Sequence, residues 1–128
     1  MAVSVLDRPV GGKYRMEHLL HAAVFCVAVA LSLFHLAEKP YHHDESIHAF
    51  YSWKIAEGDI LGYKYDPVYH GTLLYYAAGL VMRLFGDNDF TGRLSAVLFG
   101  LGVLGFAWPL RRYLGRWGAL AFASLMTF

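Results

Sequence analysis

The sequence has a single cysteine, little charge and no marked excess of either sign. Because Cys26 is the one cysteine among 128 residues, no intrachain disulfide can form. Lysine and arginine number 11 against 10 aspartates and glutamates, a formal net charge of +1. Nucleic-acid binding needs clustered basic side chains that neutralise phosphates, and here they are few and scattered. We therefore expect no nucleic-acid partner.

Apolar residues dominate the composition and gather into long blocks. They make up 57% of the chain, against 16% charged residues. Long blocks, as opposed to amphipathic spacing, are typical of membrane proteins. We therefore predict an all-α fold of polytopic transmembrane helices, an integral multi-pass protein of the cell membrane in contact with the lipid bilayer.

The first apolar block predicts a membrane span over residues 19–37. From Leu19 to Leu36 it would extend roughly 27 Å as a helix, about the thickness of a bilayer core. A secretory signal peptide is the alternative interpretation. Against it, the block is longer than a usual signal and no Ala-x-Ala-like cleavage site follows near Glu38. We expect an uncleaved anchor.

Basic residues set the expected orientation of this span. Arg8, Lys13 and Arg15 precede it, whereas the residues after it carry both signs of charge. The positive-inside rule then places residues 1–18 in the cytoplasm and residues 38–93 in an extracytoplasmic loop.

Two short helices are expected within that loop, both at the membrane surface. A carboxylate at the start, one apolar face and Gly58 as a stop predict a helix near residues 45–57. Residues 73–85 are apolar but would extend only about 20 Å and include Arg83, so we expect a surface or re-entrant helix. If residues 73–85 crossed the membrane, Arg111, Arg112 and Arg116 would lie outside, against the positive-inside rule.

The remaining blocks predict a second span over 94–110, a cytoplasmic basic turn over 111–116 and the start of a third span over 117–128. The last block is about 18 Å long and falls short of a ~30 Å bilayer core, which suggests the N-terminal part of a longer protein. Gly92, Ala96 and Gly100 form a smooth face that suits packing against another helix. Glycine is also simply frequent in membrane helices.

Ionisable side chains concentrate just after the first span, and the most informative are Asp44 and Glu45. At a helix N-terminus, unpaired N–H groups and the helix dipole favour a charged carboxylate. Such a carboxylate can orient or deprotonate a hydroxyl, or bind a cation. The alternative is that Asp44 only caps the helix and Glu45 lies in its first turn.

The same stretch permits a metal site, with ligands drawn from His42, His43, Asp44 and His48. His43 and His48 could approach each other across a helical turn. Their spacing matches no established zinc signature. No cofactor is certain on this basis, and a divalent metal remains an alternative.

Candidate anion ligands follow further along the chain. His70 can donate a hydrogen bond to an anion and Gly71 permits close backbone approach, while Arg83 and Arg93 suit a phosphate. Alternatively, Arg83 extends to lipid headgroups and Arg93 pairs with an aspartate of residues 87–89.

Several of these pieces, taken in order, carry a resemblance to a known class of enzymes. They are Asp44-Glu45, His70-Gly71, Leu73-Leu74-Tyr75-Tyr76, Leu84-Phe85-Gly86 and Arg93-Leu94-Ser95-Ala96. About residues 19 to 128 resemble the N-terminal region of the membrane glycosyltransferases of the GT-C class. The likeness is to relatives of the dolichyl-phosphate-mannose protein mannosyltransferases and to a prokaryotic group described as flippase-activity-associated proteins.

The resemblance implies a reaction and roles for the residues. Enzymes of this class transfer a sugar from a polyprenyl phosphate, on the non-cytoplasmic side, to a protein, lipid or glycan acceptor. Asp44 would be the catalytic base, with Glu45 supporting it, and His70 and Arg93 would hold the lipid phosphate. Arg83 is a further candidate ligand of the lipid phosphate, and it is included only because the expected topology places it on the same side of the membrane.

Two departures from the class stand out. Thr72 follows His-Gly where the flippase-associated group usually has proline. Enzymes of the class also need more spans, and often a soluble domain, so we expect the 128-residue chain alone to be inactive. The rival hypotheses are a non-catalytic membrane accessory or scaffold of the same fold, and an extracytoplasmic metal-binding membrane protein.

Overall fold

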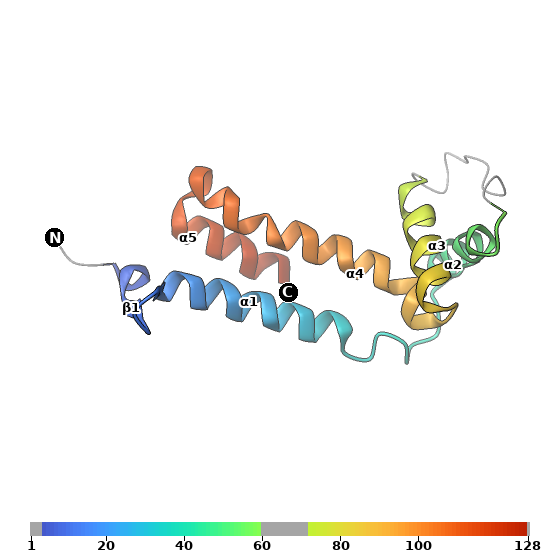
Figure 1. Cartoon of the computed structure of the whole chain (residues 1–128), viewed down its shortest axis with the longest axis horizontal. Helices are drawn as coiled ribbons and strands as arrows, with labels where there is room; N and C mark the ends of the chain where they lie inside the picture. Colours follow the sequence, from blue (N-terminus) through green and yellow to red (C-terminus); the bar gives the residue numbers. More distant parts are fainter. Residues whose placement is uncertain (1–3, 60–71, 128) are drawn as a thin grey trace. The chain divides into compact units, whose positions relative to one another are not determined.

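The computed structural model describes residues 4–59 and 72–127, and the described chain is mostly helical (Figure 1), which confirms the all-α prediction. A short 3-10 helix and a two-stranded ribbon precede the main helices. The elements in order are η1 Val5–Asp7, β1 Pro9–Val10, β2 Tyr14–Arg15, α1 Met16–Leu33, α2 His43–Ala56, α3 Leu73–Phe85, α4 Asp89–Gly105 and α5 Ala107–Thr127.

The chain divides into two compact units. The terminal unit comprises Met1–Ser32 and Gly100–Phe128, and the central unit comprises Leu33–Phe99.

A ribbon that the sequence analysis did not predict leads into α1. β1 and β2 pair antiparallel, with Pro9 opposite Arg15. Gly11 and Gly12 have φ angles of 61° and 83°, a left-handed conformation that favours glycine, and they turn the chain between the strands. The ribbon therefore depends on backbone geometry and not on alternating apolar residues.

Helix α1 begins and ends earlier than the predicted span over 19–37. Glu17 lies in its first turn with 4% of its surface exposed, where the helix dipole favours a carboxylate. After Leu33 the chain turns, and His35 has a positive φ of 53°. The helix is long and apolar enough to cross a membrane, and only 11% of its residues are buried inside the structure. It is therefore not a core helix of the described chain.

The second predicted span over 94–110 is shifted toward the N-terminus, because α4 begins at Asp89. Asn88 and Thr91 form a reciprocal cap before it. The Thr91 N–H donates to Asn88 Oδ1 at 3.0 Å, and the Asn88 N–H donates to Thr91 Oγ1 at 3.0 Å. These bonds satisfy N–H groups that a helix start leaves unpaired, so the helix begins here and not at the apolar residues.

The predicted basic turn over 111–116 is only partly a turn in the structure. Arg111 and Arg112 lie within α5, and the break falls at Gly115, which has φ 71° and ψ 168°. Pro109 is tolerated in the first turn of α5 because its missing N–H would have had no helical partner there. Helices α4 and α5 meet at a bend of 44° and together have the length and composition of a broken span or of a re-entrant loop.

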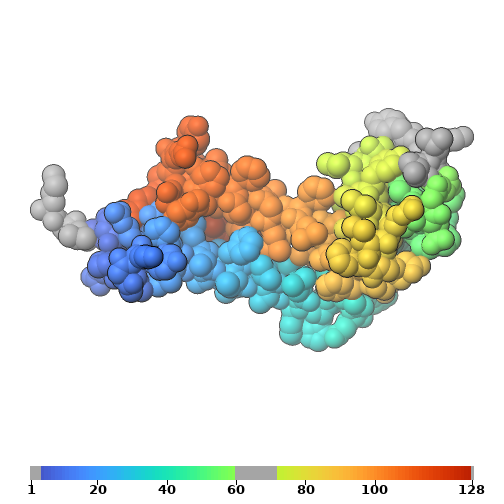
Figure 2. Space-filling view, in the orientation of Figure 1, coloured from blue at the N-terminus to red at the C-terminus, as the bar shows by residue number. Residues whose placement is uncertain are grey.

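Within the terminal unit, small side chains form the core between helices. Figure 2 shows the N-terminal segment in blue packed against the C-terminal segment in orange and red. Alanine at three of the four core positions lets helical backbones approach closely. The buried cluster consists of Ala28, Leu104, Ala107 and Ala123.

Within the central unit, α2 packs against α3 (Figure 1), close to the predicted bounds 45–57 and 73–85. Tyr75 and Ser52 are fully buried in this unit. A Cβ added at Gly79 would lie 2.9 Å from the Ser52 carbonyl oxygen and 3.0 Å from Ile55 Cγ2. Glycine at this position therefore sets how closely the two helices approach.

Candidate functional site

Arg93 of α4 organises the central unit. Its side chain is only 10% exposed. Its Nη1 donates to the Leu36 carbonyl at 2.7 Å, and its Nη2 donates to Glu45 Oε2 at 3.0 Å. The guanidinium also lies 4.4 Å from the centre of the Tyr41 ring, a cation–π contact. One arginine thus joins the segment after α1, the start of α2 and α4.

Glu45 is held on two sides. The His42 N–H donates to Glu45 Oε2 at 3.1 Å, which satisfies a backbone donor just before α2. Arg93 and then this N–H lower the pKa of Glu45 from its usual value of 4.5. Both groups favour the charged carboxylate, so Glu45 is anchored as an anion.

Asp44 contrasts with its neighbour. It is exposed in the first turn of α2, and within the described residues its carboxylate makes no hydrogen bond or ion pair. Asp44 is therefore free to meet another molecule, whereas Glu45 is committed to the protein.

A cavity of about 390 Å³ lies beside the Glu45–Arg93 pair. We call it the basic cavity, because its polar lining includes a lysine, an arginine and two histidines. Lys39 supplies a cationic side chain in addition to Arg93, whereas His35 is paired with Glu38. Such a lining suits an anion. The lining residues are Phe34, His35, Leu36, Lys39, Pro40, His42, Glu45 and Arg93.

The basic cavity includes no other predicted anion ligand that lies within the described residues. Arg83 is exposed in the last turn of α3 and does not line the basic cavity. His70 and Gly71 lie outside the described residues. The alternative pairing of Arg93 with an aspartate of residues 87–89 is wrong, because its guanidinium pairs with Glu45.

The predicted metal ligands do not gather either. Over residues 4–59 and 72–127, no three histidine, cysteine or acidic side chains form a group that could hold a metal ion. His42, at the N-cap, and His43 and Asp44, in the first turn of α2, are all exposed. Positions 43 and 48 are separated by about 140° around a helix. The His48 ring instead stacks on Tyr75, with centroids 4.7 Å apart.

A second cavity in the central unit was missed by the sequence analysis. It measures about 260 Å³, and we call it the aromatic cavity. The Tyr41 hydroxyl donates to the Asp89 carbonyl at its edge at 3.3 Å. Burial, and then the Asp89 charge, raise the pKa of Tyr41. The lining residues are Tyr41, Ala49, Phe50, Trp53, Met82, Asp87, Asn88 and Asp89.

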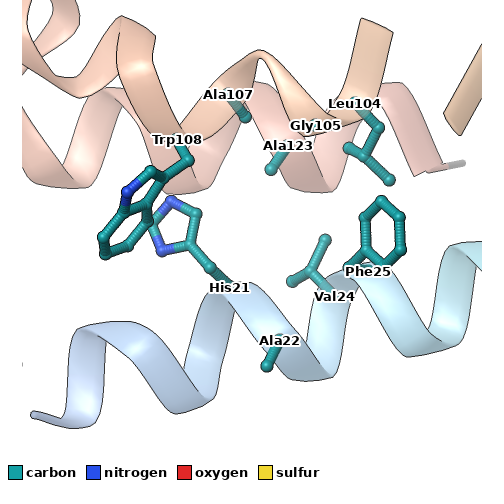
Figure 3. Close-up of a pocket in the computed structure, with 9 residues that line it drawn as sticks. All are labelled: His21, Ala22, Val24, Phe25, Leu104, Gly105, Ala107, Trp108 and Ala123. Atoms are coloured by element: carbon teal, nitrogen blue, oxygen red, sulfur yellow. The ribbon is translucent and has the colours of Figure 1, made fainter. Parts of the chain in front are cut away.

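The terminal unit holds a cavity of about 260 Å³ that is lined mainly by apolar side chains (Figure 3). The His21 ring extends from α1 toward Trp108, with centroids 5.2 Å apart. His21 Nδ1 lies 3.0 Å from the Glu17 carbonyl oxygen, a bond in which Nδ1–H donates. The other lining residues visible in Figure 3 are Ala22, Val24, Phe25, Leu104, Gly105, Ala107 and Ala123.

Ion pairs also lie within the terminal unit, beside the start of α1. Arg116 Nε donates to Glu17 Oε2 at 2.8 Å, and Arg116 Nη1 donates to Asp7 Oδ1 at 2.8 Å. Arg111 lies 3.5 Å from the same glutamate. Arg111 and Arg116 of α5 are therefore paired with acidic side chains of the N-terminal segment and of the start of α1.

Comparison with known proteins finds no match of this chain to a protein-family model, to a curated protein or to a solved structure.

Proposed function

We propose that this chain is the N-terminal part of a polytopic membrane glycosyltransferase-like protein of the GT-C class. The whole protein transfers a sugar from a polyprenyl-phosphate donor to an acceptor on the non-cytoplasmic side. The observation that carries the proposal is the contrast between Asp44 and Glu45. A free carboxylate stands next to one that is fixed by Arg93, and the fixed one lines a basic cavity.

The membrane placement is supported by α1 and by the terminal unit. α1 is long and apolar enough to cross a membrane, and α4 and α5 pass the same test only as a bent pair, which fits either a broken span or a re-entrant loop. Arg116 pairs with Asp7 and Glu17, so the basic residues of α5 lie beside the N-terminal segment. Both groups of basic residues then belong to the cytoplasmic side, as the charge rule requires. The central unit, which carries Asp44, faces the exterior.

The proposed reaction uses the two carboxylates differently. Asp44 accepts the proton of an acceptor hydroxyl as that oxygen forms a bond to the anomeric carbon of the donor sugar. The bond between this carbon and the phosphate oxygen breaks, and its electron pair leaves with the lipid phosphate. Arg93 and Lys39 of the basic cavity stabilise the departing anion. Glu45 acts as a positioning residue because it orients Arg93.

Replacing Asp44 by asparagine tests this proposal. Asp44→Asn keeps the size of the side chain and removes the base, so we expect sugar transfer to fall about 10²- to 10⁴-fold. The measurement is transfer of labelled sugar from polyprenyl phosphate in membranes that contain the full reading frame. Glu57→Gln is the matched control, because Glu57 is exposed at the far end of α2, and it should retain full transfer.

Unchanged transfer by Asp44→Asn at normal protein levels would favour the non-catalytic scaffold. The scaffold hypothesis requires the fold alone, so Asp44→Asn and Glu57→Gln would then behave alike.

A further inference from the structure

The aromatic cavity presents an exposed apolar platform from α2. Phe50 and Trp53 are 52% and 41% exposed. Their ring centroids are 6.3 Å apart and their planes are inclined by 35°. Positions three residues apart lie on the same side of a helix, so both rings face the cavity together. Exposed rings that line a cavity offer a flat surface to a ligand.

Polar groups of the turn before α4 form the opposite edge of this cavity. Asp87 and Asp89 line it, and within the described residues neither carboxylate is in an ion pair or hydrogen bond. Asn88 uses its Oδ1 to accept the Thr91 N–H, which leaves its amide nitrogen to donate. The edge therefore offers several acceptors and one donor.

This combination matches a sugar ring more closely than it matches an anion. A pyranose has a C–H face that packs on an aromatic ring, and its hydroxyls point outward, where carboxylates and amides can bind them. Two carboxylates repel a phosphate. A volume of about 260 Å³ is just below the usual range for drug-sized ligands and suits a single sugar ring.

We infer that the aromatic cavity is a carbohydrate-binding site, and that it takes a neutral sugar unit of the acceptor. The role as acceptor site rests on the proposed function, but the binding of sugar does not. Tyr41 lines the aromatic cavity, and Arg93, which lies over the Tyr41 ring, lines the basic cavity. The contact between these two side chains makes the two cavities neighbours. An acceptor sugar in the aromatic cavity would therefore lie next to a donor phosphate in the basic cavity.

The inference is tested by saturation-transfer NMR on the full chain in lipid nanodiscs, with a panel of neutral methyl hexopyranosides as probes. We expect at least one of them to bind with millimolar affinity. Trp53→Ala should weaken that binding at least tenfold, whereas Trp53→Phe, which keeps an aromatic ring, should largely retain it. Asp87→Lys provides a second variant, at an exposed position outside any helix, and should also abolish binding. Phe85→Ala removes a ring that is 69% exposed and does not line the cavity, and this variant should bind normally.

Two results would overturn the inference. One is that no sugar of the panel binds, or that binding is unaffected by both Trp53→Ala and Asp87→Lys. The other is that choline binds at the cavity and the sugars do not, since aromatic rings with carboxylates can also hold an ammonium group. Sugar binding combined with undiminished transfer by Asp44→Asn would defeat the proposed function and leave the carbohydrate site intact.

Discussion

Asp44 and Glu45 are adjacent in the chain but differ in what they contact. The sequence identified both as candidate catalytic carboxylates, because acidic residues at a helix start are favoured as anions. The resemblance implied that Asp44 is the base and that Glu45 supports it, but the sequence could not show what Glu45 contacts, since its partner lies 48 positions away. No spacing rule relates residues at that distance. The structure resolves the pair by assigning Arg93 to Glu45.

The link between Glu45 and Arg93 should depend on pH. Because the pKa of Glu45 is lower in the folded chain than in the unfolded one, the pair stabilises the fold above about pH 4.5. This contribution disappears as the pH falls through the lower folded-state pKa. At neutral pH we expect Glu45→Gln to lower the free energy of unfolding by less than about 1 kcal/mol, because Glu45 is half exposed.

Thermal unfolding of the full chain at a series of pH values measures this effect. The difference between wild type and Glu45→Gln should be present at neutral pH and vanish in acid. Glu57→Gln, at the C-cap of the same helix and without Arg93 as a partner, is the matched control. A difference that persists or grows in acid would contradict the ion-pair explanation.

At the scale of elements, the short helices of the central unit were predicted more accurately than the long ones. Gly58 and Gly86 have φ angles of 106° and 92°, and each stops its helix where the sequence suggested. The predicted bounds of the longer helices were displaced because they were set at the first and last apolar residues. Their real ends depend on the cap at Asn88 and on the break at Gly115, which are polar and backbone features.

The packing of α2 on α3 depends on the missing side chain of Gly79. We expect Gly79→Ala to destabilise the full chain by about 1–3 kcal/mol, because the added methyl group meets a backbone carbonyl that cannot easily move. Gly100→Ala is the matched control, since an added Cβ there has no atom within 4 Å. It should be neutral or stabilising by up to about 1 kcal/mol, because alanine favours a helix.

Denaturant unfolding in detergent distinguishes these two variants. If both alanines raised stability equally, helix propensity would be the whole effect and the close approach of α2 and α3 would be unimportant.

At the scale of the whole molecule, the proposed topology places Asp44 outside the cell and both basic groups inside. A single introduced cysteine in a Cys26→Ser background reports on each side. A membrane-impermeant maleimide added to intact cells should label Glu57→Cys in the central unit. Lys13→Cys and Arg112→Cys should react only after the membrane is permeabilised.

The decisive measurement is the labelling of Glu57→Cys in the central unit. If Glu57→Cys reacted only in permeabilised cells, a carboxylate beside it could not meet a donor on the non-cytoplasmic side. If Arg112→Cys reacted from outside while Lys13→Cys did not, α4 with α5 would not return the chain to the cytoplasm.

Arg93 also has a consequence for how the protein is made. It bonds the carbonyl of Leu36 and the carboxylate of Glu45, which precede it by 57 and 48 positions. At ribosomal rates of roughly 5–20 residues per second, those partners wait several seconds for it. During that interval the acidic segment has already been synthesised but has no anchor. Its final conformation therefore belongs to a late stage of biogenesis, after α4 has emerged.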